Sequence, residues 1–387
     1  MEIIRVSELE NITDFTQIVK CRIVDEKFKE EHIEIICNMI NLKELDLSHN
    51  QLTNIPEAFG NNLEKLDLQM NQLTSLPEAF GNNLVNLKEL YLSHNQLINI
   101  PETFGNSLVK LEILNLSSNQ LTNIPETFGN TLVKLELLNL RMNQLTSLPE
   151  AFGNNLVNLK DLTLSHNRLI NIPDTFGNNL VNLKYLYLSH NRLINIPEAF
   201  GNNLKILNLS HNQLTNIPEA FITILVNLKW LDLSNNQLTP LPTSIFHLRQ
   251  LTEFYYHSNP IEYIPPNIQR FLDNHIRHGQ RIYQDSQSVH NSEIQKCVRQ
   301  SINNMLKNKP QFDENQTIQL ILDDKILKEK TKKQLIEYSS DKSVHTEIQI
   351  SFGDVLVAVW NRIEFHPDCN EIKCILSQLM DEPVCVC

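Results

Sequence analysis

The chain has 387 residues, of which 41% are hydrophobic and 20% charged, and its net charge is −12 at pH 7. This acidic balance argues against a nucleic-acid partner, because neutralising phosphates requires a basic surface. No apolar run approaches the ~20 residues that span a bilayer, and the first residues lack the basic and apolar regions of a secretory signal. Seven cysteines, an odd number, do not indicate a disulfide framework. We therefore expect an intracellular protein that does not associate with membranes.

The first 41 residues predict an N-terminal cap built on a degenerate repeat. Ile18 lies 24 residues before Leu42, where the first full repeat begins, and Cys21 and Ile23 stand where later repeats have leucines. Residues 29–40 have a helical pattern of apolar positions. Repeat arrays need such polar-faced ends for solubility.

Residues 42–284 contain a repeating unit of 21 to 24 residues. It reads L-x-x-L-x-L-x-x-N-x-L-x-x-I/L-P-x-x-F-G and begins at Leu42, Leu63, Leu87, Leu111, Leu135, Leu159, Leu183, Leu204, Leu228 and Leu251. Within one unit, Leu90 and Leu92 alternate with polar neighbours, which predicts a strand with one buried face. The asparagine at the ninth position has an amide that can satisfy buried turn groups. The phenylalanines from Phe59 to Phe221 are expected to form a row along the convex side.

This pattern resembles the leucine-rich repeat family, whose period it shares. The resemblance implies a curved solenoid of about ten repeats with a parallel sheet on its concave side. At the C-terminal end, Phe254 and Tyr256 replace strand leucines, and residues 268–277 have the spacing of a capping helix. The leucines, asparagines and phenylalanines are interpreted as structural rather than functional.

The outward strand positions of the repeats are free to carry function. From the fourth repeat onward they include aliphatic and aromatic residues, which we predict to bind a protein partner: Ile113, Leu137, Tyr185, Tyr187, Ile206, Trp230 and Tyr255. Exposed aromatic anchors surrounded by polar residues are typical of protein-binding hot spots. Alternatively, the C-terminal part of the chain covers this stripe, or the stripe is unused, since single apolar residues are common on surfaces.

The eighth repeat position contains histidine in five repeats: His49, His94, His166, His190 and His211. Imidazole is a ligand for zinc, copper and nickel. No carboxylate or cysteine joins this row, however, so we expect solvated or hydrogen-bonded side chains rather than a metal site. No cofactor is expected either.

Residues 285–387 are predicted to form a small, mostly α-helical domain. Apolar positions at helical spacing occur in residues 290–308, 314–338 and 371–380, and Ser351 to Asp354 read as a capping box before a further helix. This region also contains His366, Cys297, Cys369, Cys374, Cys385 and Cys387. Their spacing matches no paired zinc motif, and we interpret the cysteines as isolated reduced thiols.

Two resemblances concern this C-terminal region. Repeats followed by a helical domain resemble the bacterial effector ubiquitin ligases, which implies a catalytic cysteine in a Cys-x-Asp motif. That motif is absent, because Cys369 is followed by Asn370 and Glu371. The repeated Pro-Glu-Ala/Thr-Phe-Gly-Asn segments and the sequence from Val359 to Ile363 resemble leucine-rich repeat proteins encoded by giant viruses of amoebae. The second resemblance implies a viral protein in the host cytoplasm.

The sequence therefore predicts a non-enzymatic protein-interaction module that binds a host or viral protein through the concave face of its repeats. The alternative is an effector-type ubiquitin ligase, in which the repeats select the substrate and the helical domain carries a catalytic cysteine. A gene product of recent duplication without a strongly selected function is a third possibility, because several repeats are nearly identical.

Overall fold

The computed structural model describes residues 2–3, 14–23, 32–198, 200–261, 264–277, 281–283, 313–340, 356–357, 359–360, 363–364, 369–370 and 372–373. The chain divides into two units, Met1–Ser286 and Gln287–Cys387. The boundaries expected from the sequence, after residues 41 and 284, stay predictions.

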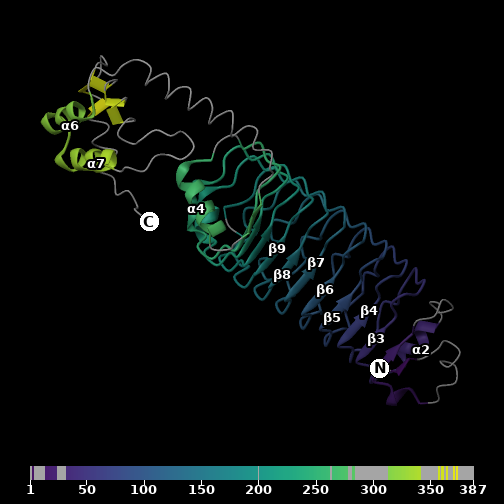
Figure 1. Cartoon of the computed structure of the whole chain (residues 1–387). Helices are drawn as coiled ribbons and strands as arrows, with labels where there is room; N and C mark the ends of the chain where they lie inside the picture. Colours follow the sequence, from purple (N-terminus) through teal and green to yellow (C-terminus); the bar gives the residue numbers. More distant parts are fainter. Residues whose placement is uncertain are drawn as a thin grey trace. The chain divides into compact units, whose positions relative to one another are not determined.

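Each repeat contributes one three-residue strand to a parallel sheet in which the strands follow one another in sequence order (Figure 1). Ten of the strands lie in the predicted repeats. The sheet comprises β1 (Glu2–Ile3), β2 (Lys20–Arg22), β3 (Glu44–Asp46), β4 (Lys65–Asp67), β5 (Glu89–Tyr91), β6 (Ile113–Asn115), β7 (Leu137–Asn139), β8 (Asp161–Thr163), β9 (Tyr185–Tyr187), β10 (Ile206–Asn208), β11 (Trp230–Asp232), β12 (Glu253–Tyr255) and β13 (Arg281–Tyr283). Strands β1 and β13 extend the sheet beyond the predicted repeats.

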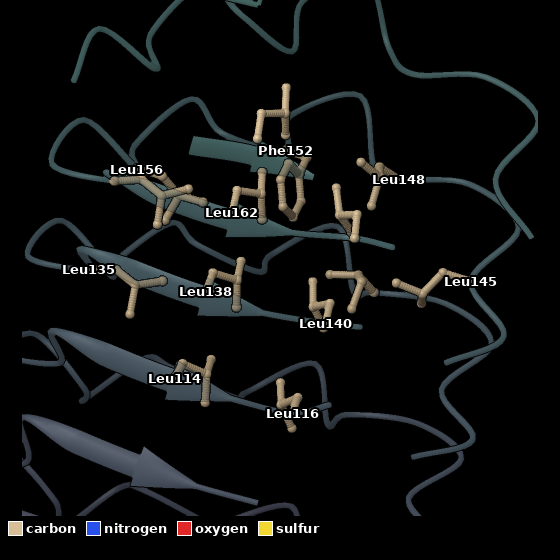
Figure 2. Close-up of a cluster of buried hydrophobic side chains, with 14 of the residues drawn as sticks. Leu114, Leu116, Leu135, Leu138, Leu140, Leu145, Leu148, Phe152, Leu156 and Leu162 are labelled. Atoms are coloured by element: carbon tan, nitrogen blue, oxygen red, sulfur yellow. The ribbon is translucent and has the colours of Figure 1, made fainter. Parts of the chain in front are cut away.

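The strands are short because only the alternating leucines of each repeat can be buried. The central residue of each strand from β3 to β12 is buried, and its two neighbours are half-buried in every strand except β4, where Asp67 is also buried. Leucines of successive repeats meet across the sheet, as Leu114 and Leu138 do in β6 and β7. Figure 2 shows how these leucines stack in layers with Phe152. The core is therefore one continuous column along the solenoid.

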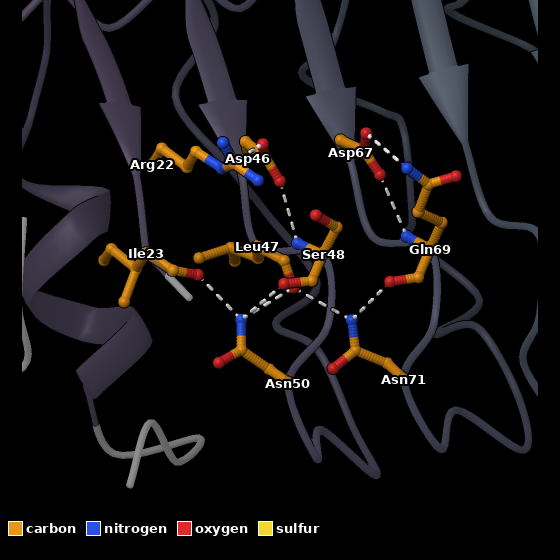
Figure 3. A network of polar contacts seen from close by, with 9 residues as sticks. All are labelled: Arg22, Ile23, Asp46, Leu47, Ser48, Asn50, Asp67, Gln69 and Asn71. Carbon is orange, nitrogen blue, oxygen red and sulfur yellow. Dashed lines mark hydrogen bonds and ion pairs between the residues drawn. The ribbon is translucent and has the colours of Figure 1, made fainter. Parts of the chain in front are cut away.

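A ladder of buried asparagines connects each repeat to the one before it (Figure 3). The side-chain amide of Asn71 donates hydrogen bonds to the backbone carbonyls of Leu47 and Leu68, at 2.9 and 3.0 Å. Its Oδ1 accepts a hydrogen bond from the backbone N–H of Leu52 at 3.0 Å. Equivalent bonds recur from Asn50 to Asn259. These bonds satisfy turn groups that would otherwise be buried without partners, which confirms the role predicted for this asparagine.

The phenylalanines form the expected row beyond the leucine core. Rings of successive repeats, from Phe59 to Phe221, lie 5.2 to 6.4 Å apart between centroids. The glycine that follows the phenylalanine has a positive φ of 88° to 92° in five repeats, at Gly81, Gly105, Gly129, Gly153 and Gly201. Glycine adopts this conformation without steric cost, so these positions fix the turn after the ring.

Short helical segments occur toward both ends of the solenoid. They are η1 (Phe15–Gln17) and α2 (Ile33–Cys37) near the N-terminus, and α3 (Glu219–Ile224), η3 (Thr243–His247) and α4 (Pro266–Arg277) near the C-terminal end. Ile18, Cys21 and Ile23 are buried, as expected for a degenerate repeat. Phe254 and Tyr256 are also buried, and α4 lies where the capping helix is predicted.

The second unit contains two described helices of several turns, α6 (Glu314–Asp323) and α7 (Glu329–Ser340). Both lie in the segment for which the sequence predicts amphipathic helices. A small cluster packs Ile321, Leu327 and Leu335 against Leu356 and Trp360. The predicted helix at 290–308, the predicted capping box and the segment after residue 373 lie outside the described residues.

Candidate functional site

The concave face is formed by the two outward-facing residues of each strand. Because the strands pair in parallel without slippage, these residues form two columns that run along the sheet. The first column reads Glu44, Lys65, Glu89, Ile113, Leu137, Asp161, Tyr185, Ile206, Trp230 and Glu253. The second reads Asp46, Asp67, Tyr91, Asn115, Asn139, Thr163, Tyr187, Asn208, Asp232 and Tyr255. The parts of this face therefore differ in the residue types that the columns carry and in how their side chains pack.

The structure places the seven predicted residues on this face in two groups, and all seven are half-buried. Ile113 and Leu137 pair directly across β6 and β7. Asp161 separates this pair from the second group. The second group, which we call the aromatic group, consists of Tyr185, Tyr187, Ile206, Trp230 and Tyr255.

The aromatic group is continuous across four strands. Tyr185, Ile206 and Trp230 are direct neighbours in the first column of β9, β10 and β11. The Trp230 and Tyr255 rings lie 5.5 Å apart between centroids, with an angle of 47° between their planes. The Tyr255 hydroxyl donates a hydrogen bond to Glu253 at 2.7 Å. These contacts hold the Trp230 and Tyr255 side chains in position before any partner arrives, which lowers the entropic cost of binding.

Burial changes the protonation behaviour of the face near the aromatic group. Partial burial raises the pKa of Asp161, although a hydrogen bond from Thr163 opposes this effect. Burial also raises the pKa of Tyr187, with further contributions from Asp161 and Tyr185. Both shifts have the partial burial of the side chains in this section of the sheet as their main cause.

The N-terminal half of the face has a different character, because its charged side chains pair with one another. Lys65 lies 3.0 Å from a carboxylate oxygen of Glu89, and its ammonium group lies 4.9 Å from the centroid of the Tyr91 ring. The Tyr91 hydroxyl donates to Glu89 at 3.1 Å. Tyr91 is thus engaged by an ion pair, in which it contacts both Lys65 and Glu89.

The histidine row lies at the edge of the face where the strands end. Every residue of the eighth repeat position has a φ between 54° and 57°, a left-handed conformation in which histidine and asparagine are enriched. The rings of His166, His190 and His211 stack, with centroid distances of 4.2 and 4.0 Å. Burial lowers the pKa of His166 and His190, as do neighbouring histidines and Arg141. Within the described residues, no three histidine, cysteine or acidic side chains are arranged to hold a metal ion.

The structure describes the side chains of two cysteines, Cys21 and Cys369. Cys21 is buried in the N-terminal cap, and Cys369 donates a weak hydrogen bond to Asn370 at 3.5 Å. Cys297, Cys374, Cys385, Cys387 and His366 lie outside the described residues. The described helices include none with the length and apolar character needed to cross a membrane.

Sequence reasoning missed two features of this face. The stacking of the three histidines depends on the left-handed backbone, which the sequence pattern did not reveal. A row of lysines at the second repeat position, beside the strand starts, was also overlooked. Its signal was present, because Lys160, Lys184, Lys205 and Lys229 occupy the same position in four successive repeats.

Comparisons with known proteins identify the same repeats. The profile of the leucine-rich repeat family matches residues 61–121, 109–169, 157–202 and 202–261, and a second leucine-rich repeat profile matches residues 41–62. No curated protein sequence matches the chain significantly.

Several solved structures are similar. A leucine-rich repeat protein of Leptospira interrogans is 28% identical, with a TM-score of 0.46, over 70% of this chain and 84% of that one. A chain from the octameric complex of Latrophilin 3, Unc5D and the leucine-rich repeats of FLRT2 is 25% identical, with a TM-score of 0.55, over 64% and 82%. A chain from the Drosophila Toll–Spatzle complex is 19% identical, with a TM-score of 0.57, over 69% and 36%. The family profile covers residues 61–261, which is more than half of the chain, and each match contains strands of the observed sheet. The chain therefore belongs to the leucine-rich repeat family.

Proposed function

We propose that this chain binds a protein partner through the concave face of its repeats, with the aromatic group as the main contact and Ile113 and Leu137 as a second contact. The leucine-rich repeat fold is typical of protein-interaction modules that are not enzymes, and solenoids use their concave surfaces for binding. The structurally similar FLRT2 repeats are part of a complex with two other proteins.

One observation carries this proposal. Tyr185, Ile206 and Trp230 stand in consecutive register on a surface where leucine-rich repeats need no apolar residue for folding. Their strand neighbours at the core-facing position are fully buried leucines, so the core is complete without them. Large side chains that are half-buried on such a surface resemble the anchors found at hot spots.

The finer parts of the proposal rest on the sequence. Resemblance to giant-virus proteins supports a host or viral partner in the host cytoplasm. The C-terminal unit is proposed to be mainly helical, in line with α6 and α7. We do not propose ligase activity, because the Cys-x-Asp motif of the effector ligases is absent: Cys369 is followed by Asn370 and Glu371.

Affinity purification of the full chain from host cells identifies the partner, and titration with the purified partner then tests the site. Trp230→Ala is expected to weaken the complex at least about 30-fold, the effect of a hot-spot residue. Tyr91→Ala is the matched control, because Tyr91 lies on the same face but is engaged by Glu89 and Lys65. Equal affinities for the two variants would show that the partner binds elsewhere.

A further inference from the structure

Three lysines stand in register along the edge of the concave face where the strands begin. The backbone N–H of Lys205 donates to the carbonyl of Lys184 at 2.8 Å, and the N–H of Lys229 donates to the carbonyl of Lys205 at 2.9 Å. These bonds set the three residues at the spacing of neighbouring strands, ~4.8 Å. Each lysine directly precedes an outward residue of the first column: Tyr185, Ile206 or Trp230.

Lysines elsewhere on this face have carboxylate partners. The distances between ammonium nitrogen and carboxylate oxygen are 3.2 Å for Lys43–Glu64, 2.7 Å for Lys88–Glu64, 3.0 Å for Lys65–Glu89 and 2.7 Å for Lys160–Glu136. Among the residues that the structure describes, Lys184, Lys205 and Lys229 form no ion pair. Like charges on directly opposed residues of adjacent strands repel one another. These three cations are thus close together and uncompensated.

The three lysines line a partly open hollow of about 350 Å³, together with Asn182, Asn203, Asn227 and Gln250. The side-chain amides of Asn182 and Asn203 donate to the backbone carbonyls of Val157 and Val181, at 2.8 and 2.7 Å. These bonds hold the amides in place. No acidic side chain lines the hollow, so its chemistry favours an anionic group.

The neighbouring face determines which kind of anion fits. The aromatic group lies immediately beside the lysines. The two columns of the concave face also contain three acidic residues in this section, Asp161, Asp232 and Glu253. A nucleic acid, with its uniform row of phosphates, would meet these carboxylates as well as the lysines. A peptide can place acidic residues against the lysines and apolar residues against the aromatic group, because side chains alternate along an extended chain.

We propose that the hollow at Lys184, Lys205 and Lys229 binds the carboxylates of an acidic peptide segment of the partner, whose apolar residues contact the aromatic group. This inference rests on the proposed function and adds the chemistry of the partner. It also explains why an acidic chain keeps three unpaired lysines beside its aromatic group.

The test uses a labelled peptide of about ten residues, ~33 Å long when extended, that alternates glutamate with leucine and phenylalanine. A second peptide has glutamine in place of every glutamate. Binding of each peptide to the full chain is measured by fluorescence anisotropy. We expect the glutamate peptide to bind about tenfold more tightly at low salt, and this preference to disappear at high salt.

Variants locate the effect. The triple variant Lys184→Gln, Lys205→Gln and Lys229→Gln is expected to bind both peptides equally. The control variant Lys43→Gln and Lys88→Gln, which removes paired lysines at the same repeat position, is expected to keep the preference. A preference that survives the triple variant, or is lost in the control variant alone, would overturn the proposal.

The remaining outcomes separate this inference from the proposed function. If Trp230→Ala weakens both peptides and neither is preferred, the hollow does not bind carboxylates, but the aromatic group still binds peptide. If the preference depends on the lysines and Trp230→Ala has no effect, the hollow binds acidic peptide and the aromatic group is not the main contact. Failure of the glutamate peptide to bind overturns the inference. Tighter lysine-dependent binding of a ten-nucleotide thymidine oligomer overturns it in favour of nucleic acid.

Discussion

The two units of the chain differ in the kind of partner that their buried polar side chains have. In the repeats, the buried polar side chains are mainly neutral amides and hydroxyls, and each ladder asparagine bonds backbone groups of its own repeat and the previous one. Among the described residues of the C-terminal unit, the buried polar contacts include a charge cluster. The Lys373 ammonium lies 2.7 Å from Asp324 and 2.6 Å from Glu364, and 5.2 Å from the centre of the Trp360 ring.

The two arrangements differ in how far the loss of one polar contact destabilises the surrounding structure. A repeat contacts only its neighbours, so the loss of one ladder amide is a local defect. The charge cluster joins Asp324 to Glu364 and Lys373, two residues of a later segment, so the loss of its cation affects both segments. Burial lowers the pKa of Lys373, but its hydrogen bonds to Asp324 and Glu364 outweigh this effect and raise the pKa above its usual value.

The largest expected effect is therefore in the C-terminal unit. Lys373→Met leaves the carboxylates of Asp324 and Glu364 without their cation in a buried site, which is expected to destabilise this unit by about 4 kcal/mol. The fluorescence of Trp360 in a Trp230→Phe background reports the unfolding of this unit. Lys325→Ala, at an exposed position beside Asp324, is the control. A loss below about 1 kcal/mol for Lys373→Met would mean that the cluster contributes little.

A smaller effect is expected from the ladder. Asn143→Ala removes the acceptor of the Leu121 N–H and the donor to the carbonyls of Leu116 and Leu140. Leaving these groups unpaired should lower the unfolding free energy by about 3 kcal/mol. Hydrogen exchange should show the loss only in the repeats next to Asn143. The control Asn130→Ala alters an exposed side chain outside the ladder, and equal losses for the two variants would contradict the role of the ladder.

The turn after the phenylalanine row should be more tolerant than the ladder. Gly201→Ala places a Cβ 2.8 Å from the carbonyl oxygen of Leu180 at a φ of +92°, which is expected to cost about 2 kcal/mol. Gly60→Ala has no positive φ and its nearest atom lies 3.9 Å away, so it should be close to neutral. Chemical denaturation compares the two variants, and a neutral Gly201→Ala would show that this turn adapts without strain.

The smallest effect concerns the histidine stack and depends on pH. Because the pKa values of His166 and His190 are lowered in the folded state, the unfolded chain takes up protons first as the pH falls below the ordinary value of 6.5. Stability should therefore be highest above this pH and decrease below it. His190→Asn, which keeps a residue suited to the left-handed backbone, should reduce this decrease in thermal unfolding. His94→Asn, outside the stack, should not, and identical pH profiles for the two variants would argue against coupling.

The same contrast explains how much the sequence could predict. The repeats were predictable because one pattern occurs ten times, so that strand positions, the asparagine ladder and the phenylalanine row all follow from a single spacing. The position of Trp230 on the concave face followed from the same register, whereas its packing against Tyr255 depends on side-chain conformation. The cluster of Lys373, Asp324 and Glu364 has no periodic signal, because tertiary packing alone brings these residues together. The Asp313–Gln316 capping box at α6 was also missed, although its residue types and spacing favour helix initiation.

The left-handed column beside the sheet limits how this protein can acquire new specificities. Its ten positions hold only histidine, methionine, serine and asparagine, none of them branched at Cβ, and all have a φ near 55°. Branched side chains clash with the backbone in this conformation. The two strand columns, in contrast, already accept acidic, basic, aliphatic and aromatic residues. Evolution or engineering of a new binding preference is thus expected to proceed through the strand columns and the lysine edge, while the left-handed column varies within a small set of residues.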